Sequence, residues 1–314
     1  MRTIVIGGAG FIGSNLCQTL IKRGHNVCCV DDLSLGTEKN IEKLEGRKEF
    51  SFSKGNAADE AWLGSVFEEE KPEYVFHLAA NSDIKASATS PSIEYERTYS
   101  TTFSILSCMR NHKVGKLFFA STSAVYGDKR DIILNETTPG LEPVSYYGAA
   151  KLGSEALISA FSHMNDMKSL IFRFPNVIGP GLTHGVIFDF IAKLKNNPHK
   201  LEILGDGSQS KPYIYVNDLI DAIMLEAFRN ESIMEIYNIG VEGKTSVTSI
   251  ADMVCEAMGL KDVHYEYTGG NIGWKGDVPS YQYDLTKIHD RGWKAAFNSD
   301  EAVKATLESL KLNQ

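Results

Sequence analysis

The sequence lacks long hydrophobic runs and an excess of positive charge. No apolar stretch approaches the roughly 20 residues that span a bilayer, and the first one, "TIVI", meets glycine after four residues. A run of that length is too short for the core of a signal peptide. The 314 residues carry a formal net charge of −8, which argues against nucleic acid as a partner. We therefore expect a cytoplasmic protein with neither a membrane nor a nucleic-acid partner.

Cysteine is scarce and irregularly placed. The five cysteines are Cys17, Cys28, Cys29, Cys108 and Cys255, and they form no CxxC or Cys/His framework of the zinc-binding kind. We therefore expect no metal site. An odd number of cysteines without a disulfide framework fits a reducing compartment, where free thiols act as small buried hydrophobes.

The first half of the chain alternates short apolar runs with amphipathic stretches. The spacing predicts helices at residues 11–22 and 93–110, and strands at residues 2–6, 26–30, 50–53, 74–78, 116–120 and 169–174. Strands separated by helices indicate βαβ units and a parallel sheet that is covered on both faces. The fold predicted is therefore α/β, with a Rossmann-type doubly wound parallel sheet.

The texture changes after residue 174, where glycine and proline cluster and the elements become shorter. This change predicts a dinucleotide-binding domain at residues 1–175 and a smaller mixed α/β lobe for the substrate at residues 176–314. Some late segments are expected to return to the first domain.

A glycine-rich segment, "IVIGGAGFIGSNL", follows the first predicted strand and opens the first helix. Gly7, Gly10 and Gly13 form GxxGxxG, and Gly8 offers an alternative first glycine in GxGxxG. Glycines here permit a tight turn and a close backbone approach, so that main-chain N–H groups hold a pyrophosphate. Asp31 ends the second strand 18 residues after Gly13, where a carboxylate binds ribose hydroxyls and repels a 2′-phosphate. The segment therefore predicts NAD binding in preference to NADP.

Tyr147 and Lys151 stand four residues apart in "SYYGAAKLGSEAL" and share one face of a helix. A lysine ammonium beside a phenol favours the phenolate, which predicts a general base that works near neutral pH. Tyr146 has Ala150 at the same spacing and cannot form such a pair. Thr122 follows the strand at residues 116–120 and offers a hydroxyl at the strand end.

In this order, the three features resemble the extended short-chain dehydrogenase/reductase family, in its NAD-dependent nucleotide-sugar epimerase and dehydratase branch. "GGAGFIG", "VFHLAA" and "YGAAK" match the first domain. "FRFPNVIGP", "LEILGDGSQSKPYIYVNDL", "YNIG" and "GWKGDVP" match the substrate lobe. The later segments look most like those of UDP-galactose 4-epimerase-like proteins.

The resemblance implies a role for particular residues. Thr122, Tyr147 and Lys151 would be catalytic, with Lys151 also bonded to the nicotinamide ribose. The expected substrate contacts are Thr122, Asn176, Lys211, Trp274 and Asp277. The expected NAD contacts are Gly7, Gly10, Phe11, Ile12, Gly13, Asp31, Asp32, Asn56, Leu78, Ala79, Ala80, Tyr147 and Lys151. A homodimer through helices near residues 93–110 and 147–163 is also implied.

Several positions depart from the pattern of that branch. Its dehydratases carry an acid pair after the catalytic threonine, where this chain has Ser123 and Ala124. Neither residue can serve as the acid and base that elimination of water needs. Lys211 stands where an arginine is usual, Trp274 replaces a second arginine, and Thr98 replaces an asparagine that commonly supports the active site. The nucleotide therefore stays open among UDP, GDP, dTDP and CDP.

The function predicted is NAD-dependent oxidation of a nucleotide sugar at C4, first as a 4-epimerase of the UDP-glucose/galactose kind, with a 4-dehydrogenase as the alternative. Return of the hydride to the other face of the sugar makes a 4-epimerase, whereas release of the keto sugar makes a 4-dehydrogenase, for example on a GDP-sugar or GDP-heptose. A 4,6-dehydratase and a non-catalytic NAD-sensing protein are the remaining alternatives. The sequence does not separate epimerase from dehydrogenase, because the difference lies in pocket shape.

Overall fold

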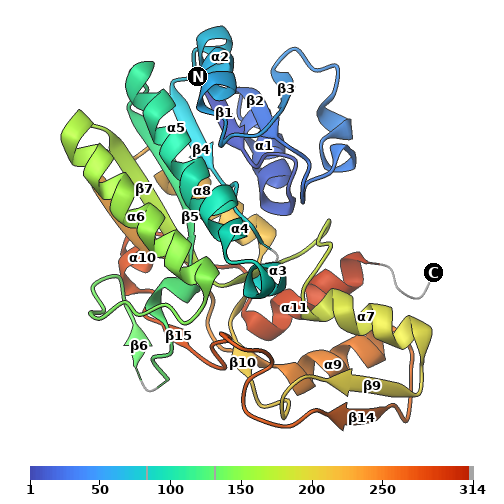
Figure 1. Ribbon diagram of the computed structural model, residues 1–314. Coiled ribbons are helices and arrows are strands. Elements are labelled where there is room, and N and C mark those ends of the chain that lie inside the picture. Colours follow the sequence, from blue (N-terminus) through green and yellow to red (C-terminus); the bar gives the residue numbers. More distant parts are fainter. Residues whose placement is uncertain (83, 131, 311–314) are drawn as a thin grey trace. The chain divides into compact units, whose positions relative to one another are not determined.

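The computed structural model describes residues 1–82, 84–130 and 132–310 (Figure 1). Their contacts divide the chain into two units. The first unit comprises Met1–Val125, Ser145–Arg173 and Ile220–Tyr237. The second comprises Tyr126–Val144, Phe174–Leu219 and the chain from Asn238 onward. Among the helices that the structure describes, none has both the length and the apolar character to cross a membrane.

A seven-stranded sheet forms the centre of the first unit, in the order β12-β7-β5-β4-β1-β2-β3. Strand β1 pairs in parallel with β2 and β4, β2 with β3, and β4 with β5. The chain therefore reverses direction of winding between β1 and β4, and ligands of such sheets bind at the carboxyl ends of the strands at that point. The strands are β1 (Arg2–Ile6), β2 (Asn26–Asp31), β3 (Phe50–Lys54), β4 (Tyr74–His77), β5 (Lys116–Thr122), β7 (Lys168–Phe174) and β12 (Met234–Asn238).

Both faces of this sheet are covered, as the period of two along β4 shows. Tyr74 and Phe76 stack with ring centroids 4.6 Å apart and contact the ring of Phe228 on one face. Val75 belongs to the core cluster on the other face, where His77 approaches α5. Alternate side chains of one strand are thus buried on opposite faces. The predicted α/β, Rossmann-type parallel sheet is confirmed.

The helices of the first unit run between these strands, and α5 and α6 lie side by side (Figure 1). The predicted helix at residues 11–22 is α1. The helix expected at residues 93–110 is present as one continuous helical run, but a π-helical turn, η3, lies between α4 and α5. The elements are α1 (Phe11–Lys22), η1 (Glu38–Asn40), η2 (Glu42–Leu44), α2 (Glu60–Glu70), α3 (Ile84–Thr89), α4 (Ser92–Glu94), η3 (Tyr95–Tyr99), α5 (Ser100–Asn111), η4 (Ser123–Tyr126) and α6 (Tyr146–Asn165). Helix α8 (Val216–Glu226) is divided between the units, with the part from Ile220 onward in the first.

The second unit has its own apolar core, formed by α7, α9 and α11 with short strands. Parallel pairs join β8 to β11, β9 to β14 and β6 to β15, and β10 pairs antiparallel with β13. The strands are β6 (Ile133–Leu134), β8 (Asn176–Ile178), β9 (Lys200–Ile203), β10 (Ser210–Lys211), β11 (Tyr213–Tyr215), β13 (Thr245–Ser246), β14 (His264–Tyr267) and β15 (Gln282–Tyr283). The helices are α7 (Val186–Asn196), α9 (Val247–Ala257), α10 (Thr286–Asp290) and α11 (Ser299–Ser309).

Candidate active site

The glycine-rich turn connects β1 to α1 and leaves no space for side chains. A Cβ atom on Gly13 would lie 2.1 Å from the carbonyl oxygen of Gly7, and Gly7 itself has a φ of +83°. Gly8 packs against Cys29, whose Sγ would lie 2.6 Å from a Cβ added there. Gly10 caps α1 and has no side chain to occupy the first N–H groups of the helix. These free donors and the helix dipole suit a pyrophosphate.

Asp31 is fixed at the carboxyl end of β2 by main-chain donors. Its Oδ2 accepts a hydrogen bond from the Ala9 N–H at 3.0 Å, and its Oδ1 accepts one from the Leu33 N–H at 2.8 Å. Burial raises the pKa of Asp31, and both hydrogen bonds act against that rise. The carboxylate thus lies beside the glycine-rich turn, with Gly36 packed against it. This arrangement suits the ribose hydroxyls of an adenosine.

The other predicted cofactor residues lie at carboxyl ends of neighbouring strands. Leu78 and Ala79 follow β4, and both donate N–H hydrogen bonds to the Ile6 carbonyl, at 2.8 and 2.9 Å. Asp32 and Asn56 are exposed and accept hydrogen bonds from nearby main-chain N–H groups. Phe11, Ile12 and Ala80 are partly buried at the start of α1 and after β4.

Thr122, Tyr147 and Lys151 come together where β5 ends and α6 begins. Thr122 is the last residue of β5, and its hydroxyl forms a hydrogen bond with the Tyr147 phenol. Lys151 is fully buried on α6; its Nζ donates to the Ala120 carbonyl at 2.7 Å and lies 4.5 Å from the centroid of the Phe119 ring. The three residues that the sequence singles out as catalytic therefore lie close together in the first unit.

The charge balance at Tyr147 differs from the one the spacing predicts. Burial raises the pKa of Tyr147, and the negative charge of Glu94 raises it further, whereas the hydrogen bond with Thr122 lowers it. A phenol removed from water loses the solvation that stabilises its anion. The expected low pKa of Tyr147 is thus wrong for the protein alone.

Lys151 has the opposite response to the same surroundings. Burial lowers the pKa of Lys151 to about 7, and the negative charges of Glu94 and Glu155 raise it against that effect. His77 of β4 also faces Lys151; burial and the lysine's positive charge lower the pKa of this histidine well below its usual range, so it is neutral. Lys151 can therefore gain or lose a proton near neutral pH.

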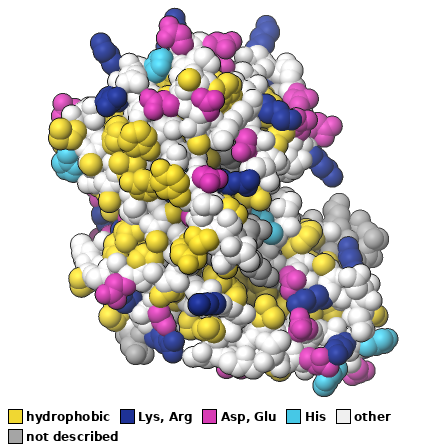
Figure 2. Space-filling view, viewed as in Figure 1, with side chains coloured by type: hydrophobic (Ala, Val, Ile, Leu, Met, Phe, Trp, Pro, Cys, Tyr) yellow, Lys and Arg dark blue, Asp and Glu magenta, His cyan; other side chains and the backbone are white. Residues whose placement is uncertain are grey.

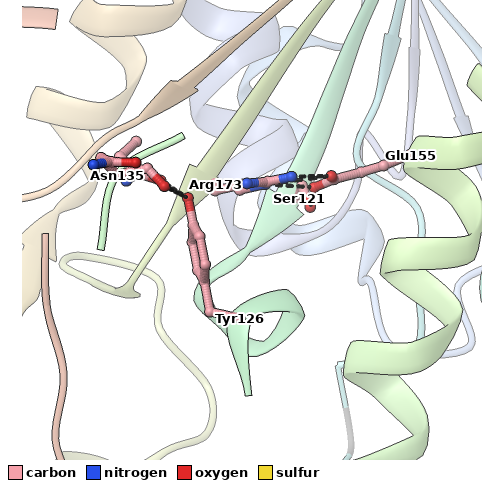
Figure 3. A network of polar contacts seen from close by, with 6 residues as sticks. Ser121, Tyr126, Asn135, Glu155 and Arg173 are labelled. Carbon is pink, nitrogen blue, oxygen red and sulfur yellow. Dashed lines mark hydrogen bonds and ion pairs between the residues drawn. The ribbon is translucent and has the colours of Figure 1, made fainter. Parts of the chain in front are cut away.

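Glu155 belongs to a buried ion pair behind the catalytic group (Figure 3). Arg173 of β7 donates from Nε to Glu155 Oε1 at 3.0 Å and from its Nη2 to Oε2 at 2.6 Å, with both side chains 4% exposed. Ser121 also donates to Glu155. Paired and bonded in this way, the two charges hold α6 against β5 and β7. Sequence reasoning missed both residues, although Arg173 in the apolar run "SLIFRF" was a visible signal.

Three of the predicted substrate residues of the second unit, Lys211, Asp277 and Trp274, lie together, and Asn176 lies on another strand. Lys211 donates to Asp277, whose side chain is 7% exposed. The Asp277 N–H donates to the Trp274 carbonyl at 3.1 Å, so Trp274 is three residues away in the same turn. Asn176 is exposed at the start of β8.

The loop after η4 is fixed within the second unit by Tyr126. The Tyr126 hydroxyl donates to the Asn135 carbonyl at 3.0 Å (Figure 3) and lies 2.7 Å from Asn238 Oδ1. The Asn238 amide also donates to the Leu134 carbonyl at 3.0 Å. These two bonds of Asn238 join residues that are 112 and 104 positions apart in the sequence.

Comparison with known proteins agrees with this geometry. Residues 3–240 match the family model described as the NAD dependent epimerase/dehydratase family. The chain belongs to that family.

Relatives and solved structures are similar over nearly the whole chain. A UDP-glucose 4-epimerase of Mycolicibacterium smegmatis is 30% identical, over 99% of this chain and 99% of that protein. The crystal structure of a UDP-galactose 4-epimerase is 34% identical, with a TM-score of 0.87 over 99% of this chain and 98% of that one. The Thermus thermophilus UDP-glucose 4-epimerase in complex with NAD is 29% identical, with a TM-score of 0.88 over 99% of each chain.

The cofactor of the family is NAD, and the residues present fit it. The glycine-rich turn has no Cβ where a pyrophosphate approaches, the first turn of α1 offers free N–H donors, and Asp31 is fixed beside them. When bound, NAD supplies the hydride acceptor for oxidation and the hydride donor for the return step.

Proposed function

We propose that the protein is an NAD-dependent 4-epimerase of nucleotide sugars, with UDP-glucose and UDP-galactose as the first pair to test. The support from similarity is that the relatives named above carry this activity in their names. The observation that carries the proposal is the contact of Thr122 with Tyr147, one helical turn before the buried Lys151.

In the proposed reaction, Tyr147 accepts the proton of the sugar hydroxyl at C4 as the C4 hydrogen leaves as hydride. Thr122 orients that hydroxyl, and Lys151 stabilises the phenolate by its positive charge. In the return step, Tyr147 gives the proton back to the new oxygen while the hydride returns to C4 on the opposite face. The hydride and the proton removed in the first step are both returned in the second, so no external reductant is consumed.

The residues after Thr122 favour this chemistry over dehydration. Ser123 and Ala124 lie in the 3-10 turn η4, and neither side chain is an acid. Elimination of water across C5 and C6 needs one group to remove a proton and another to donate one. We therefore favour the 4-epimerase over a 4,6-dehydratase as the activity of this protein.

UDP-glucose that carries deuterium at C4 tests the proposal directly. An epimerase returns the same hydride to C4, so UDP-galactose should form with the deuterium retained and without net NADH. A keto sugar that accumulates with an equal amount of NADH would instead identify a 4-dehydrogenase. No turnover on UDP-, GDP-, dTDP- and CDP-sugars would remove the enzymatic proposal.

The nucleotide part of the substrate is proposed to contact the second unit. Lys211 is a point charge that can bind a diphosphate without the paired donors of an arginine. Its ion pair with Asp277 orients the ammonium. Trp274 offers a ring for stacking on a base, and Asn176 offers an exposed amide.

We also propose that the protein forms a homodimer through the outer face of α5 and α6. Figure 2 shows hydrophobic side chains gathered over these helices. Tyr95 is 64% exposed, Phe103 45% and Met164 82%, and the ring of Phe103 meets Phe161 edge-on. An exposed apolar face on two adjacent helices is typical of a protein interface. The described cysteines are all free and buried, which supports a cytoplasmic location.

A further inference from the structure

A buried polar row that runs from α4 through η3 into α5 faces the catalytic helix α6. Glu94 is the last residue of α4 and is 2% exposed, and Thr98 and Thr102 follow it at intervals of four, 1% and 0% exposed. A buried carboxylate is expensive unless hydrogen bonds and an opposite charge stabilise it. A positive group near Glu94 is therefore expected to stabilise its carboxylate.

The hydrogen bonds described for Glu94 come from neutral donors. The Asn81 side-chain amide donates to Glu94 Oε1 at 2.8 Å, and the Thr98 hydroxyl donates to Oε2 at 2.8 Å. The Asn81 N–H donates to Thr98 Oγ1 at 3.2 Å, which closes the group. These bonds fix both carboxylate oxygens but supply no positive charge.

The row meets α6 within one turn of Lys151. Thr102 Oγ1 lies 3.0 Å from Ser154 Oγ, three residues after Lys151, and 2.9 Å from His77 Nε2. Gly153 makes this approach possible, because a Cβ there would lie 3.1 Å from the ring of Tyr99. Segment α4 and turn η3 both pack on α6.

We propose that Glu94 is a positioning residue for the reaction, which stabilises the ammonium of Lys151 and so sets the pH range in which the Tyr147–Lys151 pair works. The inference rests on the proposed function for its consequence in catalysis, though not for the electrostatic effect of Glu94 on Lys151.

The other titratable groups around Tyr147 and Lys151 have to be compared with Glu94. Glu155 also faces Lys151 and raises its pKa, but Glu155 is already paired with Arg173. His77 is neutral, and the raised pKa of Tyr147 keeps its phenol protonated in the protein alone. The negative charge of Glu94 raises the pKa of both Lys151 and Tyr147, so its removal lowers both.

The first test measures Lys151 itself and needs no turnover. Carbon-13 labelling at lysine Cε, with Lys151→Met to assign the signal, follows the titration of Lys151 by NMR. The pKa of Lys151 in the wild-type protein is about 7. Glu94→Gln should lower it by about one unit, as loss of a nearby opposite charge does. Glu96→Gln, which removes an exposed carboxylate two residues away, is the matched control and should leave the value unchanged. An unchanged Lys151 titration in a folded Glu94→Gln protein overturns the proposal.

The second test follows the pH profile of kcat. Both limbs of the profile should move to lower pH in Glu94→Gln, because deprotonation of Tyr147 and of Lys151 each becomes easier. Glu94→Asp keeps the charge and should restore the position of both limbs, even where its shorter chain lowers the plateau. A lower plateau with unmoved limbs would show a structural role only and refute the inference. Absence of wild-type turnover would refute the proposed function and leave the NMR result to decide on Glu94.

Discussion

At the scale of single residues, Gly13 shows how closely the cofactor turn is packed. A Cβ at Gly13 would lie 2.1 Å from the Gly7 carbonyl oxygen and 2.8 Å from the Gly8 Cα. A methyl group here cannot be accommodated by moving a flexible side chain, because the atoms it meets belong to the backbone.

Gly13→Ala should therefore weaken NAD binding at least tenfold and destabilise the fold by about 1–3 kcal/mol, the usual range for overpacking. Isothermal titration and thermal melting measure the two effects. Gly115→Ala is the control, because nothing lies within 4 Å of a Cβ at that position. Equal NAD affinity in both variants would contradict the role of Gly13.

Tyr147 has a natural control in its neighbour. Tyr146 is 53% exposed and lacks a lysine one turn later, whereas Tyr147 contacts Thr122.

Tyr147→Phe should lower kcat by about 10²–10⁴-fold, the usual worth of a positioned acid or base, and leave NAD bound. Tyr146→Phe should leave kcat within about twofold. Epimerisation assays and the absorbance of bound cofactor check both results. Full activity of Tyr147→Phe would remove this phenol from the mechanism.

At the scale of elements, the outer face of α5 and α6 offers a test of assembly. Phe103 on α5 and Phe188 on α7 are exposed to the same degree, 45% and 44%. They differ in surroundings, since only Phe103 belongs to the apolar patch described above.

Phe103→Glu should convert a dimer to a monomer, because a charge in an apolar interface has no partner. Light scattering at several concentrations measures the mass, and Phe188→Glu should behave as the wild type. A wild-type protein that is monomeric at all concentrations would contradict the dimer.

The elements also show how far sequence reasoning reaches. The strands of the sheet and the helix α1 are encoded locally, by apolar runs and by a glycine turn, and were predicted well. The π-helical turn at η3 was not predicted, because it depends on how the segments on either side of it pack, and the residue types of 93–110 do not reveal that packing. Glu94 and Glu155 were missed for another reason: whether a carboxylate is buried is set by tertiary packing, and the partners of Glu155 come from β5 and β7.

At the scale of the whole molecule, the units are discontinuous in the sequence. Segment Ser145–Arg173 brings the catalytic helix to the first unit, and Ile220–Tyr237 adds the strand β12. The sequence predicted that some late segments return to the first domain, but local signals do not show which ones, because that depends on contacts across the fold. The stability of the first unit includes the penalty of burying Lys151.

That penalty gives the stability a pH dependence with a definite sign. The pKa of Lys151 is about 7 in the folded protein and 10.5 for an ordinary lysine. Between these values the unfolded chain binds the proton and the folded chain does not, so this residue makes stability rise with pH across the window. The Tm of the cofactor-free wild type, relative to Lys151→Met, should therefore increase from pH 7 to pH 10. A constant difference, or one that falls with pH, would contradict the buried lysine.

The π-helical turn η3 has a consequence for how this chain tolerates change. One residue corresponds to about 100° of rotation around an α-helix. Deleting one residue within Tyr95–Tyr99 would give a more regular helix, yet it would swing Glu94 away from α6 while α5 stayed packed. The π-helical turn thus sets the rotation of α4 relative to α5 about the helix axis. A variant with better local geometry would lose the carboxylate from the neighbourhood of Lys151.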